Sequence, residues 1–258
     1  MEKLKISIVT PSYNQGKFIE EAIKSVAEQG YQNFEHIIID GGSTDETVDI
    51  LKKYPHLKWV SEPDEGQSDA LNKGFLQATG DVIGWLNADD FYLPGTFRKV
   101  SQQMSNPSIA AVYSNVRFID KDRNFIRNFI SHRPLRWFMF FSCYIPSTTF
   151  FFRKEIVEQG ILIDKTIDLS MDKDFFAHIM KAGYRMKYVN DFFAAFRWHD
   201  SNKSLESKEV RNTRYAEGIT IINKHSPFYV EPTPENIHLY FKVEKKIQFV
   251  KGIMRLIS

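Results

Sequence analysis

Two adjacent carboxylates, Asp89 and Asp90, follow an apolar run in the segment GWLNADDFYLPG at residues 84–95. The residue two positions before Asp89 is the amide Asn87. Hard divalent cations such as Mg²⁺ and Mn²⁺ take a few carboxylate ligands from a protein and complete their shell with water and substrate phosphate. The acidic pair alone is also explained by a turn before a helix that has Pro94 near its first position.

Three other polar segments follow apolar runs in the first half of the chain. The four segments are TPSYN (10–14), DGGSTD (40–45), EPDEGQSD (62–69) and NADD (87–90), and the runs before them are 4–9, 34–40, 57–62 and 81–86. Each run is typical of a short buried strand. Because parallel strands place their carboxyl ends at one edge of a sheet, we expect these segments to line one cleft for a polar ligand.

Helical periodicity separates these strands. Helices are predicted over 17–29, 43–53 and 67–78, and Ser43 with Glu46 matches a capping box for the second. This alternation predicts an α/β fold with a Rossmann-like, largely parallel sheet flanked by helices. Further helices are predicted over 94–104 and 172–183, with strands over 110–120, 124–130, 147–153 and 186–199 and a helical, charged tail from about residue 204.

Composition narrows the class of protein. The chain has 258 residues and 43% hydrophobic residues, which suits one continuous domain with a substantial core. A net charge of +2 is too small for a general nucleic-acid binder. The single cysteine, Cys143, fits a reducing cytosol, and neither a signal peptide nor an apolar stretch of about 18 residues is found, so we expect a cytoplasmic protein. The chain also lacks a dinucleotide-binding glycine motif, a P-loop and a Cys/His zinc cluster.

Five segments in order resemble the successive motifs of the family 2 glycosyltransferases, which are inverting nucleotide-sugar enzymes with a GT-A fold. The segments are ISIVTPSYNQGKFIEEAIKSVAEQ, IIIDGGSTDET, GQSDALNKG, ATGDVIGWLNADD and MDKDFFAHIMKAGY. The resemblance covers about residues 5–200. We therefore expect a GT-A domain over 1–200, with a nucleotide-binding half at 1–105 and an acceptor half at 106–200, followed by a helical C-terminal extension at 201–258.

The resemblance also implies the donor site. Donor-binding residues would be Thr10, Pro11, Ser12, Tyr13, Asn14, Asp40, Gln67, Asp69, Asn72, Asn87, Ala88 and Asp89. The first six would hold the nucleobase, usually uracil, and the ribose, while the segment 67–72 would close over the nucleotide. Asn87-Ala88-Asp89 occupies the Asp-x-Asp position, in which the last acid binds a Mn²⁺ or Mg²⁺ ion that bridges the diphosphate. The chain departs from the common form at Asn87, which contributes no charge.

Inverting transfer needs a carboxylate that takes the proton of the acceptor hydroxyl. The family spacing, counted back eleven residues from Gly183, points to Asp172, with Asp174 as second choice. Acids at this place also act as helix caps or complement the helix dipole. Related enzymes carry a metal or diphosphate ligand at the position of His199, and Arg197 is a further candidate for phosphate. Arg153 either approaches the acceptor or begins a helix at the surface.

The expected function is transfer of a sugar from a UDP-sugar to a hydroxyl of a glycan or lipid-linked acceptor, in surface-polysaccharide or glycan assembly. Two alternatives are a nucleotidyltransferase and a non-catalytic nucleotide-sugar or glycan-binding module. The basic amphipathic segment 242–258 suits either peripheral contact with the inner face of the plasma membrane or packing on the protein body or on a second subunit. The apolar segment 136–145 suits an acceptor-side wall or a buried helix.

Overall fold

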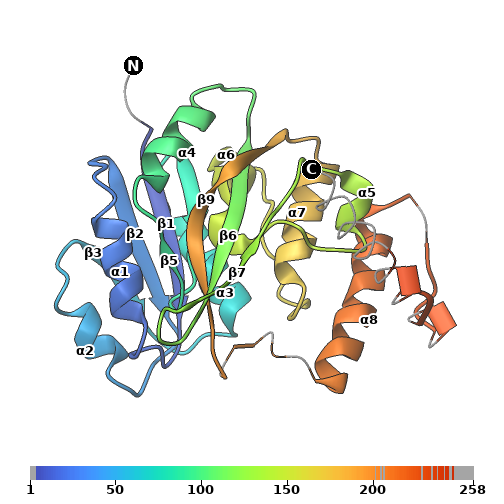
Figure 1. The fold of residues 1–258 in the computed structure, drawn as a ribbon, viewed down its shortest axis with the longest axis horizontal. Helices are drawn as coiled ribbons and strands as arrows, with labels where there is room; N and C mark the ends of the chain where they lie inside the picture. Colours follow the sequence, from blue (N-terminus) through green and yellow to red (C-terminus); the bar gives the residue numbers. More distant parts are fainter. Residues whose placement is uncertain are drawn as a thin grey trace.

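The structure is a computed structural model, and it describes residues 4–200, 202, 203, 205, 207–227, 229–233, 235, 236, 238–240, 242, 243 and 246. Its centre is a twisted sheet with helices packed on both faces (Figure 1). The predicted α/β class is confirmed.

The first half of the chain builds four parallel strands. They are β1 (Ile6–Ser12), β2 (Phe34–Asp40), β3 (Leu57–Ser61) and β4 (Val82–Trp85). Their order in the sheet is β3-β2-β1-β4, and every neighbouring pair is parallel. Helices α1 (Ile19–Ala27), α2 (Thr47–Leu51) and α3 (Gln67–Gln77) connect them, as the alternating pattern predicts.

The second half adds strands of mixed direction. These are β5 (Phe91–Tyr92), β6 (Ala111–Asp120), β7 (Phe125–Phe129), β8 (Phe151–Arg153) and β9 (Met186–Trp198). Strand β8 is antiparallel to both β4 and β6, and β7 is antiparallel to β6. Strand β9 runs parallel to β6 and antiparallel to β5. The two-residue strand β5 is too short to give a periodic pattern, so it was not predicted.

Successive side chains of each strand point to opposite faces of the sheet. Ile37 and Ile39 pack with α3 on one face, and Ile38 packs with α1 and α2 on the other. Phe151 and Phe152 are divided between the faces in the same way. Helices α6 (Glu155–Glu158), α7 (Met171–Lys181) and α8 (Lys208–His225) contribute to the core on the α3 face, and α4 (Thr96–Met104) to the core on the α1 face.

Several local predictions are corrected. Helix α2 begins at Thr47 with no side-chain cap, and the Ser43 hydroxyl accepts from the backbone N–H of Asn14 and donates to Asp40, so the capping box is wrong. Residues 147–149 form a 3-10 turn, η1, and only the three residues that follow Phe150 form a strand. Within 136–145, a short helix α5 (Arg136–Met139) is found.

The tail is described only in part. Helix α8 packs against α7 (Figure 1), which agrees with a helical C-terminal extension. Most of the predicted amphipathic segment 242–258 lies outside the described residues. Within the part of the chain that the structure describes, every helix is too short or too polar to cross a bilayer.

Candidate active site

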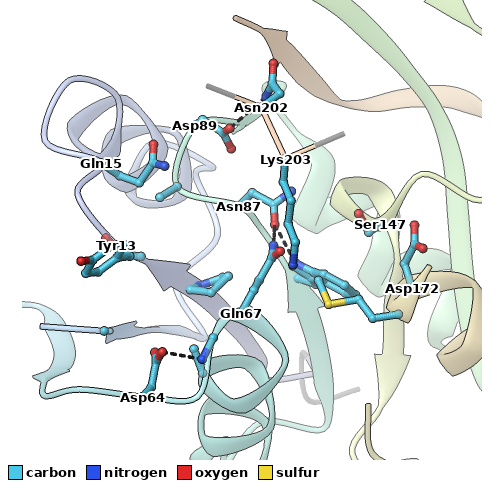
Figure 2. Close-up of a pocket in the computed structure, with 18 of the residues that line it drawn as sticks. Tyr13, Gln15, Asp64, Gln67, Asn87, Asp89, Ser147, Asp172, Asn202 and Lys203 are labelled. Carbon is cyan, nitrogen blue, oxygen red and sulfur yellow. Dashed lines mark hydrogen bonds between the residues drawn. The ribbon is translucent and has the colours of Figure 1, made fainter. Parts of the chain in front are cut away.

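The four polar segments meet at one pocket of about 650 Å³ at the carboxyl edge of the parallel strands (Figure 2). Each segment contributes to its lining: Pro11 and Ser12 end β1 and Tyr13 follows it, Gly41 follows β2, Pro63, Asp64, Gly66 and Gln67 follow β3, and Asn87, Ala88 and Asp89 follow β4. The predicted convergence on one cleft is confirmed. Pro11, Ser12, Tyr13, Gln67, Asn87, Ala88, Asp89 and Asp172 are the predicted site residues that line it.

Asp89 and His199 lie in contact although 110 residues separate them in the chain. Their Oδ2 and Nε2 atoms are 3.0 Å apart, and the Asp89 side chain is 18% exposed against 6% for His199. Asn202 lies beside them, with Nδ2 3.3 Å from the same Asp89 oxygen. The His199 ring stacks on Phe18 at 4.7 Å between centroids, which fixes its orientation.

Strand β5 produces this contact. Phe91 and Tyr92 pair antiparallel with Ala195 and Ala194 of β9, directly after the Asp89-Asp90 turn. The pairing therefore fixes the end of β9, and with it the segment that carries His199, against the end of β4. The two residues of β5 therefore hold Asp89 and His199 close together, although they are far apart in the sequence.

Asp90 is a buried connector with 1% of its surface exposed. One carboxylate oxygen accepts from the Arg197 backbone N–H at 2.9 Å. The other accepts from the Thr148 hydroxyl at 2.5 Å and from the Asn87 amide at 3.2 Å. Burial, and then the Asp89 carboxylate, raise the pKa of Asp90 well above its ordinary value. Asp90 thus joins the ends of β4 and β9 to η1, next to the pocket residue Ser147.

Asn87 is held from both ends of its amide. Its carbonyl oxygen accepts from the Trp85 indole at 2.8 Å and from the Gln67 amide at 3.0 Å, while its nitrogen donates to Asp90. Gln67 is the first residue of α3, so this contact connects the start of α3 to the end of β4 (Figure 2).

Asp172 lies in the first turn of α7 and reaches the pocket apart from Asp89 (Figure 2). Its Oδ1 accepts from the Lys173 backbone N–H at 2.7 Å, and Cys143 Sγ is 3.8 Å from its Oδ2. Burial raises the pKa of Asp172, while the charges of Lys173 and Arg214 oppose that rise. A carboxylate in such surroundings is suited to accept a proton.

Asp174, the second choice for the base, does not line this pocket. It is 1% exposed and is held by Lys224 Nζ at 2.8 Å and by His225 Nε2 at 2.8 Å. Its two partners belong to α8, so Asp174 is committed to the packing of α7 on α8.

Four predicted donor residues, Thr10, Asn14, Asp40 and Asn72, do not line the pocket. Thr10 Oγ1 lies 2.9 Å from His36 Nε2 on the neighbouring strand, and both residues are buried. Asp40 accepts from the backbone N–H and hydroxyl of Ser43 and from the Ser61 hydroxyl. The Asn72 amide pairs with the backbone of Ile163 at 2.8 and 3.0 Å. Asn14 has a positive φ of 51°, and its Oδ1 accepts from Thr44 N at 2.9 Å.

Asp69 also lies outside the pocket lining. Its carboxylate is paired with Lys73 at 3.1 Å and with Lys165 at 3.2 Å. The role of Asp69 and of the four residues above in donor binding stays a prediction.

Two arginines that are candidates for the site bind groups elsewhere in the protein. Arg197 is 2% exposed and uses its guanidinium on the carbonyls of Asp89 and Lys121 and on Glu21, so it forms part of the scaffold beneath the site. Arg153 donates to the carbonyls of Met104, Asn106 and Ile109, which holds the end of β8 against the segment after α4.

Sequence reasoning missed several lining residues, among them Gln15, Asp64, Ser147, Asp168, Asn202 and Lys203. Asn202 and Lys203 follow His199 in a polar segment, which was the available signal. No sequence pattern indicates Ser147 or Asp168, because their positions depend on how η1 and the loop before α7 fold back onto the sheet.

The residues at Asp89 fit a divalent cation that takes most of its ligands from elsewhere. No group of three or more His, Cys, Asp or Glu side chains suited to a metal is found among the described residues. Asp89 lines the pocket and contacts the imidazole of His199, which does not line it, so the pair provides two donors. Mg²⁺ and Mn²⁺ commonly complete such a shell with water and substrate phosphate.

The family model described as Glycosyl transferase family 2 matches residues 7–191, which is well over half of the chain. The chain belongs to glycosyltransferase family 2. The matched range includes all four polar segments and Asp172, and it ends before His199.

Curated relatives of this family 2 glycosyltransferase include proteins of polysaccharide synthesis. It is 23% identical over 244 residues to an uncharacterized glycosyltransferase of Nostoc sp., covering 86% of the chain and 74% of that protein. It is 32% identical over 135 residues to the putative teichuronic acid biosynthesis glycosyltransferase TuaG of Bacillus subtilis, covering 50% and 53%. It is 33% identical over 128 residues to Escherichia coli chondroitin synthase, covering 48% of the chain and only 19% of that protein.

Solved structures confirm that the glycosyltransferase has the GT-A fold. Staphylococcus aureus TarS in complex with UDP matches with a TM-score of 0.66 at 19% identity, covering 89% of this chain and 68% of the other. The mannosyltransferase PcManGT of Pyrobaculum calidifontis, in complex with GDP-Man and Mn²⁺, matches with a TM-score of 0.67 at 18% identity, covering 92% and 69%.

Proposed function

We propose that this glycosyltransferase transfers a sugar from a UDP-sugar to an acceptor hydroxyl with inversion, in a metal-dependent reaction. The observation that carries the proposal is the arrangement of one pocket: Asp89, which contacts His199, lines it at one place, and Asp172 lines it at another. Donor atoms for a cation and a base for the acceptor are the two functions that such a transfer requires.

On the donor side, Asp89 and His199 would hold Mn²⁺ or Mg²⁺ together with the diphosphate of the donor. When bound, such an ion neutralises the charge that grows on the leaving diphosphate. Tyr13 is 60% exposed at the pocket and offers an aromatic face to a nucleobase. Thr10, Asn14 and Asp40 would maintain the shape of the nucleobase and ribose site.

On the acceptor side, Asp172 accepts the proton of the attacking hydroxyl. The hydroxyl oxygen forms the new bond to the anomeric carbon while the bond to the nucleotide breaks on the opposite face of the sugar. This single displacement inverts the configuration and needs no covalent enzyme intermediate. General-base assistance of this kind contributes about 10²–10⁴-fold to the rate.

Two solved relatives in complex with donors support a nucleotide-sugar site, since TarS binds UDP and UDP-GlcNAc and PcManGT binds GDP-Man. We assign residues 1–105 to the nucleotide half, 106–200 to the acceptor half, and 201–258 to a helical extension. The polysaccharide relatives favour a glycan or lipid-linked acceptor in surface-polysaccharide synthesis.

A thermal-shift panel tests the donor. The melting temperature is measured with UDP, GDP or dTDP, each with and without Mn²⁺. UDP together with Mn²⁺ should raise it most. Asp89→Ala should abolish the metal-dependent part of that rise and the slow hydrolysis of UDP-sugars. Asp64→Ala is the matched control, because Asp64 also lines the pocket but does not contact His199. If UDP gives no metal-dependent stabilisation in the wild-type protein, the proposed donor is wrong.

A further inference from the structure

Helix α8 places one of its faces beside the acceptor part of the pocket. Glu217 accepts from the backbone N–H of Asp168 at 2.8 Å and from that of Leu169 at 3.1 Å. Both of those residues line the pocket, directly before the helix that carries Asp172. Arg214 precedes Glu217 by three residues, so it lies one turn away on the same face of α8.

Arg214 is half-buried, and among the described residues we find no hydrogen bond or ion pair for its guanidinium. Its positive charge acts on Asp172, where it lowers the pKa against the effect of burial. A guanidinium that is partly removed from water is stabilised when a carboxylate or phosphate accepts two parallel hydrogen bonds from its five N–H donors. The buried arginine of the same site, Arg197, is by contrast satisfied by two carbonyls and Glu21.

The pocket is otherwise acidic. Asp64, Asp89, Asp168 and Asp172 line it, and Lys203 is the single basic side chain in the lining among the described residues. Lys203 is paired with Asp168. An acceptor that carries negative charge would be repelled here unless a cation compensated for its charge beside Asp172.

We propose that Arg214 binds a carboxylate or phosphate group of an anionic acceptor and so selects acidic sugars over neutral ones beside Asp172. The inference rests on the proposed function, because it takes Asp172 to mark the acceptor side. Arg214 would orient the acceptor through a forked contact with the oxyanion, while Asp172 faces the reacting hydroxyl.

Ligand-observed NMR titrations with UDP and Mg²⁺ present test the preference. The probes are methyl glucoside, methyl glucuronide and methyl glucoside 6-phosphate, which share a ring and differ in charge. Wild-type protein should bind at least one anionic probe about tenfold more tightly than the neutral one, as a charge-assisted hydrogen bond would give. The tighter of the two anionic probes identifies the carboxylate or the phosphate as the group recognised.

Arg214→Gln should abolish the preference, and Arg214→Lys should retain part of it, because the charge remains and the fork is lost. Arg185→Gln removes the same charge from an exposed position before β9 and should leave the preference intact. Equal wild-type affinity for neutral and anionic probes would overturn the inference, as would an Arg214→Gln protein that keeps the preference.

A second titration separates donor from acceptor. If Arg214→Gln weakens UDP-glucuronate binding relative to UDP-glucose, then Arg214 recognises the donor sugar, and the inference fails. Binding of UDP itself is measured in the same samples. Absence of metal-dependent UDP binding refutes the proposed function, whereas loss of the acceptor preference alone refutes only the role of Arg214.

Discussion

The side-chain amide of Asn87 donates a hydrogen bond to the buried carboxylate of Asp90, with 3.2 Å between Nδ2 and Oδ2. The amide oxygen of Asn87 accepts from Trp85 and Gln67 at the same time. A carboxylate at position 87 could keep the second pair of bonds but would place negative charge against Asp90. The geometry therefore explains an amide at a position where the family pattern has an acid.

Asn87→Asp should lower the free energy of unfolding by about 1–3 kcal/mol at pH 8, because it removes a donor from a buried carboxylate and adds a like charge. The loss should shrink at pH 5, where a proton shared by the two acids relieves the repulsion. Urea unfolding at both pH values measures this, with Asn87→Ala as the neutral control. Equal stability of Asn87→Asp and wild type at pH 8 would refute the explanation.

Substitution of Asp172 should affect activity, whereas substitution of Asp174 should affect stability. Asp172→Asn should stay folded and lose transfer activity, because burial already disfavours the charge that the substitution removes. Asp174→Asn should lower the free energy of unfolding by about 1.5–3 kcal/mol, because a carboxylate that is 1% exposed would lose its charge-assisted contacts with Lys224 and His225. Thermal unfolding and transfer assays on both variants check this. Full transfer activity in Asp172→Asn would exclude it as the base.

The charge of Lys173 should affect the pH at which kcat/KM falls on the acid side. Its charge lowers the pKa of Asp172, so Lys173→Met should raise that pKa and move the acid limb of kcat/KM to higher pH. Lys187→Met, which removes an exposed charge on β9, is the control and should leave the limb in place. An unmoved acid limb in Lys173→Met would mean that the titrating group is not Asp172.

His36 should contribute to acid sensitivity. It is fully buried, and burial lowers its pKa from 6.5 to about 3. Between these values the unfolded chain binds a proton that the folded chain does not, so the free energy of unfolding falls with falling pH by about 1.4 kcal/mol per unit. His36→Gln should lack this component.

Chemical unfolding from pH 3.5 to 7.5 measures the difference between His36→Gln and wild type. His56→Gln removes an exposed histidine whose charge is the smaller cause of the lowered His36 pKa, so it should change the curve much less than His36→Gln. Parallel stability curves for wild type and His36→Gln would show that the proton uptake occurs elsewhere.

The sequence by itself determined the four parallel strands, the helices between them and the shared edge that gathers Tyr13, Gln67 and Asp89. These follow from local periodicity and from the rule that parallel strands end on one side, so no distant contact has to be known. The same local pattern placed Asp172 at the start of a helix, where the structure has it at the pocket.

Only the tertiary structure decided which distant groups meet there. The contact of Asp89 with His199 depends on the pairing of β5 with β9, and the role of Asp90 depends on Thr148 and Arg197. The same holds for Arg197 itself, whose guanidinium is occupied by partners from three other parts of the chain. The type of a side chain limits what it can bind, but the order of strands in the sheet determines which partners lie within contact distance of it.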